Sequence, residues 1–139
     1  MVVCVCSQKG KLHAGRWLGI EGFFAQIQEK AHVASTGASV LMDAIYKRSK
    51  ERLAEDGVPS PTVLKTETDR IARCYDALEA RLSGQPVTFN LATIAAVSAL
   101  GYANWRGADD NWREGRDGLS AWYDAMMQNR DVAESAPIF

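Results

Sequence analysis

The stretch 87–106, VTFNLATIAAVSALGYANWR, constrains the fold of this chain more than any other. From residue 91 to residue 100 almost every position is apolar, with Thr93 and Ser98 as small polar breaks. A helix that is hydrophobic on all sides belongs inside a domain. We therefore expect a buried central helix over about residues 90–104, packed on all sides by other helices. The stretch is too short and too interrupted to cross a membrane, which needs about 20 apolar residues in a row.

The start of this helix is also visible in the sequence. Asn90 is a favourable N-cap residue, because its side-chain oxygen can accept a hydrogen bond from an unpaired backbone N–H one turn later. Thr93 stands three residues on, where it can hydrogen-bond locally. Phe89 and Ile94 have the spacing of a hydrophobic staple, which fixes how the chain enters the helix.

Size and charge limit what the chain can do. With 139 residues and 47% hydrophobic content, the chain is large enough for one ordinary core and too short for two full domains. The formal net charge of -1, with basic and acidic residues interspersed, gives no reason to expect binding to nucleic acid or to a membrane surface. Proteins and small molecules are the expected partners.

The N-terminal residues 1–15 are predicted to form an irregular segment ahead of a single helical domain over residues 16–139. One short strand, 2–6, is conceivable there, but its apolar run is too short for a signal peptide and Lys9 and Lys11 follow it. Cys4, Cys6 and Cys74 are an odd number of cysteines without disulfide or metal-ligand spacing, so we expect a reduced, cytoplasmic protein.

The remaining helices follow from apolar periodicity. A first helix begins near Arg16, and the residues 35–37, STG, either interrupt it or lie inside one long helix. Its later polar side chains are interpreted as a solvated face. They are Lys47, Arg48, Lys50, Glu51 and Arg52.

Two further helices complete the predicted bundle. Ser60 as N-cap and Pro61 in the first turn open a helix that runs to about Leu82. A last helix is expected over about residues 113–129, followed by an irregular tail from residue 131. The fold class is therefore all-α, a bundle of four to five helices.

Local motifs for catalysis are absent from the sequence. No phosphate loop, metalloprotease, hydrolase-elbow or Cys-x-x-Cys pattern occurs, and His13 and His32 have no neighbours at metal-ligand spacing. No metal and no catalytic residue is predicted. An aromatic cluster either forms an apolar pocket or packs two helices together, and we favour packing. Its members are Tyr102, Trp105, Trp112, Trp122 and Tyr123.

The second half of the chain resembles a known family. The segments DRIARCYDALEARL, FNLATIAAVSALGYANWR and NWREGRDGLSAWYDAMMQNRDVAESAPIF, in this order, resemble the C-terminal helical domain of bacterial glutathione transferases. The resemblance covers roughly residues 40–139. The matching residues are Leu41, Met42, Asp43, Ala44, Asp76, Leu78, Glu79, Leu91, Ala92, Ile94, Ala95, Ala99, Leu100, Gly101, Tyr102, Trp112, Arg113, Leu119, Trp122 and Pro137.

Two departures from the family pattern bear on function. The family's central helix opens with a Ser or Thr cap and an Asp three residues later, whereas this chain has Asn90 and Thr93, so the reciprocal contact should be weaker. In the family, glutathione is held by an N-terminal thioredoxin-like domain, but the residues before position 40 contain a single candidate strand. No cofactor is therefore predicted, and glutathione would bind only if the missing domain is supplied elsewhere.

The resemblance implies that the chain retains the half of a transferase that binds the hydrophobic substrate. By that resemblance the pocket would draw on Met42, Tyr46, Tyr102 and Trp105. We expect a protein that does not transfer glutathione alone. The alternatives are a non-catalytic module that forms a homodimer or docks to a partner protein, and a carrier of hydrophobic small molecules.

Overall fold

The computed structural model describes residues 20–53 and 57–136, with side chains at His32 and from Ala34 onward. Within these residues the chain forms five α-helices and one short 3-10 helix, without a strand. The all-α prediction is confirmed. The predicted strand 2–6, the irregular segment 1–15, Cys4, Cys6, His13 and Pro137 lie outside the described residues.

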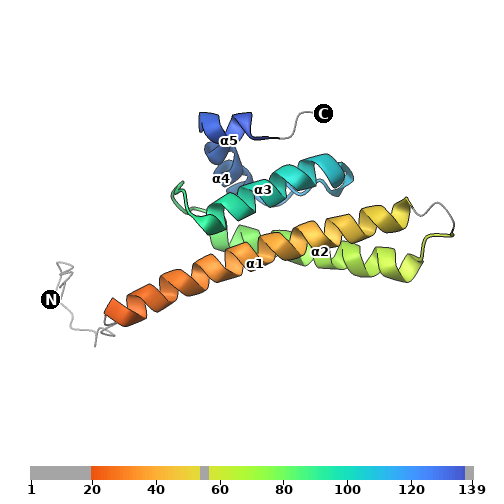
Figure 1. The fold of residues 1–139 in the computed structure, drawn as a ribbon, viewed down its shortest axis with the longest axis horizontal. Helices are drawn as coiled ribbons and strands as arrows, with labels where there is room; N and C mark the ends of the chain where they lie inside the picture. Colours follow the sequence, from red (N-terminus) through yellow and green to blue (C-terminus); the bar gives the residue numbers. More distant parts are fainter. Residues whose placement is uncertain (1–19, 54–56, 137–139) are drawn as a thin grey trace.

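Two long antiparallel helices form the base of the fold (Figure 1). Helix α1 covers Ile20–Arg52 without a break, so the STG sequence at 35–37 lies inside one long helix. Helix α2 covers Pro61–Leu82 and begins where predicted, with the Ser60 side chain accepting a hydrogen bond from the backbone of Val63. Its apolar stripe is buried, namely Ile71, Tyr75, Leu78 and Leu82.

The other helices lie on this pair (Figure 1). Helix α3, Leu91–Arg106, packs along α1, and the 3-10 helix Ala108–Asp110 follows it. Helix α4, Asp117–Met127, packs on α2 and α3, and the short helix α5, Arg130–Glu134, packs on α4. The core lies where α1, α2, α3 and α4 meet, and Leu41, Leu78, Leu100 and Leu119 are almost fully buried there.

Helix α3 is less enclosed than the sequence predicts. Seven of its residues are buried, among them Ala96, Leu100 and Ala103. Leu91, however, is 81% exposed and Ile94 48% exposed. Because α1 contacts one side of α3 along its length, the opposite side at the start of α3 remains open to solvent. The expectation of packing on all sides is therefore wrong.

The structure also corrects the predicted polar face of α1. Arg48 is only 1% exposed, and its guanidinium forms two hydrogen bonds of 2.6 and 2.7 Å with the carboxylate of Asp110. Tyr75 donates a further hydrogen bond of 3.4 Å to Asp110. A Cβ at Gly107 would lie 2.6 Å from Asp110 Oδ2, so the glycine leaves room for this carboxylate to reach α1.

The C-terminal part differs from prediction at both of its ends. Helix α4 begins at Asp117 instead of Arg113, because the chain turns between α3 and α4 through Asn111 and Gly115, both with positive φ. The tail that was predicted to be irregular contains α5. Asn129 caps this helix by accepting hydrogen bonds from the backbone of Asp131 and Val132.

Candidate functional site

A hollow in the described surface lies between α1, α3, α4 and α5. Its volume is about 260 Å³, and it is called the main hollow below. No lining residue carries a charge, and most are apolar or aromatic, which is the composition of sites for small hydrophobic molecules. The lining residues are Met42, Val97, Ser98, Gly101, Tyr102, Trp105, Tyr123, Met127, Val132, Ser135 and Ala136.

Three of the four predicted pocket residues line the main hollow. Met42 comes from α1, and Tyr102 and Trp105 come from the second half of α3. Met42 and Trp105 are 38% and 40% exposed. Tyr46 is one turn beyond Met42 on α1, is 53% exposed, and is not among the lining residues.

The rim of the main hollow is formed by an aromatic pair. The rings of Tyr102 and Trp105 meet edge to face with centroids 5.7 Å apart. The guanidinium carbon of Arg106 lies 3.8 Å from the centroid of the Trp105 ring, so the cation is close to the rim without lining the hollow. Such contacts hold flat aromatic surfaces in place against which an apolar ligand can pack.

Other aromatic residues of the predicted cluster are packed in the core. Trp112, Trp122 and Tyr123 are at most 6% exposed. The rings of Trp112 and Tyr123 meet edge to face at 5.6 Å, and Trp112 stacks on Tyr75 at 6.2 Å. The cluster therefore has an interior part, Trp112 and Trp122, and a part, Tyr102 and Trp105, that borders the hollow. Tyr123 belongs to both, because it is buried and also lines the hollow.

A chain of hydrogen bonds leads from this interior toward the hollow. The Trp112 indole N–H donates to Asn104 Oδ1 at 2.8 Å, and Asn104 Nδ2 donates to the Tyr123 hydroxyl at 3.2 Å. Burial raises the pKa of the Tyr123 phenol, and this effect outweighs the opposite effects of Asn104 and Arg113. Tyr123 is therefore a neutral phenol at physiological pH.

Several lining residues were not singled out in the sequence. Val132, Ser135 and Ala136 come from α5 and the residues after it, which were predicted to be irregular chain. Gly101 gave the one usable signal, because a glycine inside a helix usually has a packing or functional reason. Here it lies against the hydroxyl of Tyr123.

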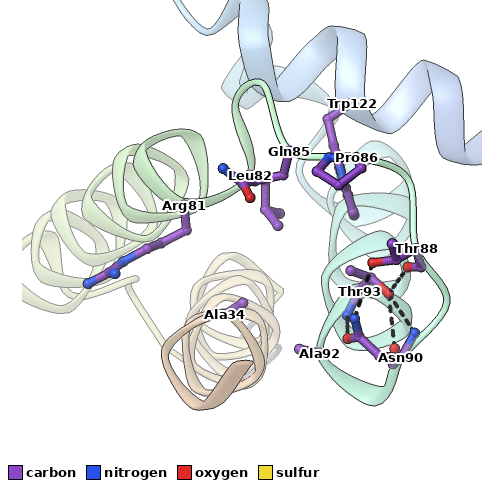
Figure 2. A pocket seen from close by; sticks show the side chains of 10 residues that line it. All are labelled: Ala34, Arg81, Leu82, Gln85, Pro86, Thr88, Asn90, Ala92, Thr93 and Trp122. Atoms are coloured by element: carbon purple, nitrogen blue, oxygen red, sulfur yellow. Dashed lines mark hydrogen bonds between the residues drawn. The ribbon is translucent and has the colours of Figure 1, made fainter. Parts of the chain in front are cut away.

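A second hollow of about 190 Å³, called the loop hollow, lies at the start of α3 beside the end of α2 (Figure 2). Asn90 Oδ1 accepts a hydrogen bond from the Thr93 backbone N–H, and Thr93 Oγ1 accepts one from the Asn90 N–H, both at 3.0 Å. Thr93 also donates to the carbonyl of Thr88 at 2.6 Å. The reciprocal cap is therefore present, between two neutral side chains. These polar groups already form hydrogen bonds within the chain.

Metal or thiol chemistry in the described part of the chain would depend on its His, Asp and Glu side chains and on its one cysteine. No cluster of His, Cys, Asp or Glu that could hold a metal ion occurs among those residues. Cys74 is a free, buried cysteine, and burial raises the pKa of its thiol. No helix within the described ranges is both long enough and apolar enough to span a membrane.

Comparison with known proteins explains this arrangement. The sequence profile of the family described as glutathione S-transferase, C-terminal domain, matches residues 43–125. The chain belongs to this family. The match includes the end of α1 from Asp43 onward, with the buried Arg48, and it includes α2, α3 and most of α4.

Solved glutathione transferase structures share the fold. One glutathione transferase family member from Pseudomonas fluorescens Pf-5, with bound S-(propanoic acid)-glutathione, is 25% identical with a TM-score of 0.65. A structure from the same organism with bound glutathione is 26% identical with a TM-score of 0.70. Both matches cover 87% of this chain, and 60% and 57% of the respective transferase chains. No curated protein sequence matches this chain.

Proposed function

We propose that this transferase C-terminal domain supplies the binding site for a hydrophobic substrate, and that the main hollow is this site. The observation that carries the proposal is the placement of Met42, Tyr102 and Trp105 around one uncharged hollow of about 260 Å³. Tyr46, exposed one turn further along α1, would extend the rim for a larger ligand.

Glutathione transfer itself would need more than the described residues. In the proposal, glutathione binds only when a thioredoxin-like domain is present, whether from this protein or from another chain. The relatives that hold glutathione are longer, since this chain spans about 60% of their length. A homodimer in the cytoplasm is the corresponding expectation for the assembled protein.

Calorimetric titration with 2-acetylnaphthalene, a neutral apolar probe, tests the site. The expected result is saturable binding to the full 139-residue chain. Ser98 is an exposed lining residue, so Ser98→Phe should fill part of the hollow and weaken binding about tenfold, equal to about 1.4 kcal/mol. Thr66→Phe, at an exposed position of α2 outside the hollow, is the matched control and should bind as the unchanged chain does.

An interaction module is the second candidate, favoured by exposed apolar residues at one end of α3. These are Val87, Phe89, Leu91 and Ile94, with exposed fractions of 40–81%. Exposed apolar groups that lie together indicate a surface for protein contacts. Self-association at micromolar concentration that Leu91→Ser abolishes, without binding of the naphthalene probe, would favour this function over the first.

A further inference from the structure

The orientation of the Asn104 amide decides what the Tyr123 hydroxyl can do. An indole N–H is only a donor, so the atom of Asn104 that faces Trp112 at 2.8 Å must be the oxygen. The amide nitrogen therefore faces Tyr123, and the phenol oxygen acts as acceptor in that contact. Within the described residues the hydroxyl proton of Tyr123 has no acceptor.

The free proton lies at the wall of the main hollow. Tyr123 and Gly101 both line the hollow, and a Cβ at position 101 would be 4.0 Å from the Tyr123 hydroxyl oxygen. Because Gly101 has no side chain, no Cβ at this position lies against the hydroxyl. The mostly apolar lining of the hollow thus includes a hydrogen-bond donor held in place by Asn104.

We infer that the Tyr123 hydroxyl is the group by which the main hollow selects its ligand, a neutral apolar molecule that carries an acceptor oxygen such as a ketone. The inference rests on the proposed function and adds the substrate class. An uncharged lining favours a neutral ligand, since an ion would lose its hydration without a compensating charge. Ser98, Tyr102 and Ser135 also carry hydroxyls in this lining, but Tyr123 is the one whose oxygen is held by Asn104. A donor fixed in this way favours an acceptor oxygen at one position of the apolar ligand.

The test uses two probes of nearly the same shape. 2-Acetylnaphthalene carries a carbonyl oxygen, and 2-isopropenylnaphthalene has a methylene group in its place. Calorimetry on the full chain should show the ketone binding about 3- to 10-fold more tightly than the alkene, the range expected for one hydrogen bond. Tyr123→Phe should abolish this preference, so that the ketone binds no more tightly than the alkene.

Two further variants separate the donor from general damage to the fold. Gly101→Ala places a methyl group 4.0 Å from the hydroxyl oxygen at a position that itself lines the hollow, so it should reduce the preference for the ketone with the Trp112 and Asn104 contacts intact. Tyr75→Phe removes another buried phenol hydroxyl, one that contacts Asp110 and not the hollow, and should keep the preference.

The outcomes distinguish this inference from the proposed function. Equal binding of both probes to the unchanged chain, or a ketone preference that survives in both Tyr123→Phe and Gly101→Ala, would overturn the role of Tyr123 while the hollow remains a binding site. If neither probe binds the folded chain, the proposed function fails and the inference fails with it.

Discussion

At the scale of single residues, the Arg48–Asp110 pair is the feature whose loss should cost most. Arg48 is buried, and its guanidinium is held by both oxygens of Asp110. Breaking a buried pair on one side leaves an uncompensated charge in the core, which costs about 3–5 kcal/mol. Asp110→Ala should therefore lower the free energy of unfolding by that amount, as measured by urea denaturation.

The neighbouring residue provides the control. Asp109 is 86% exposed at its side chain and lies 3.6 Å from Arg52, which is itself half exposed. Exposed pairs contribute about 0–1 kcal/mol. Asp109→Ala should hardly change the urea midpoint, and a large loss in this variant, or none in Asp110→Ala, would contradict the assignment of the two aspartates.

At the scale of the helices, substitution by alanine should have opposite effects on stability at Gly118 and at Gly37. A Cβ at Gly118 would lie 2.5 Å from Ser83 Cβ, and closer still to Ser83 Oγ, so α4 must approach the end of α2 closely. Gly118→Ala should destabilise the fold by about 1–3 kcal/mol through overpacking. Thermal unfolding measures this change.

Gly37 lies in the middle of α1, and a Cβ there would be 3.8 Å from Leu78 Cδ2, an ordinary contact. Because glycine inside a helix is less favourable than alanine by about 0.5–1 kcal/mol, Gly37→Ala should raise the thermal midpoint. If both alanine variants shift the midpoint in the same direction, the packing described for α2 and α4 is incorrect.

Helix α3 gives a second contrast at this scale. Leu100 is fully buried, so Leu100→Ala should cost about 2–5 kcal/mol by loss of burial and formation of a cavity. Ile94 looked equivalent in the sequence, but it is 48% exposed, so Ile94→Ala should cost well under half as much. The free energy of unfolding of both variants can be measured by urea denaturation. Equal losses would mean that Ile94 is as buried as Leu100, against the open side described for α3.

Local features of the sequence predicted some helices well but not the contacts between them. Apolar periodicity and capping residues predicted α2 and α3 closely, because Ser60, Pro61 and Asn90 act on their own backbone within one turn. Glu79 was named only as a residue that matches the family, and its carboxylate accepts a hydrogen bond from the first-turn N–H of Leu119, 40 residues later. Contacts of this range leave no local signal.

The same reason explains the limits of the site prediction. Met42, Tyr102 and Trp105 were named from a resemblance, and the structure brings them to one hollow. Arg48 was assigned to a solvated face, because its neighbours in the sequence are polar and its partner Asp110 is 62 residues away. The role of Gly101 depends on Tyr123 in another helix, and periodicity within α3 cannot show it.

At the scale of the whole molecule, the proposed site for the hydrophobic substrate is separate from any site for glutathione. The chain has the helical domain of the family, and its matches reach 57–60% of the glutathione-bound relatives. The hydrophobic-substrate site should therefore work without the glutathione site. The isolated chain in solution should thus bind a hydrophobic molecule and should not bind glutathione.

The most direct test is a paired calorimetric titration of the folded 139-residue chain, with 2-acetylnaphthalene in one experiment and reduced glutathione in the other. We expect saturable binding of the naphthalene probe, weakened by Ser98→Phe, and no saturable binding of glutathione. Saturable glutathione binding without binding of the naphthalene probe would contradict the proposed function, since the chain would then hold the half of the site that we assign to another domain.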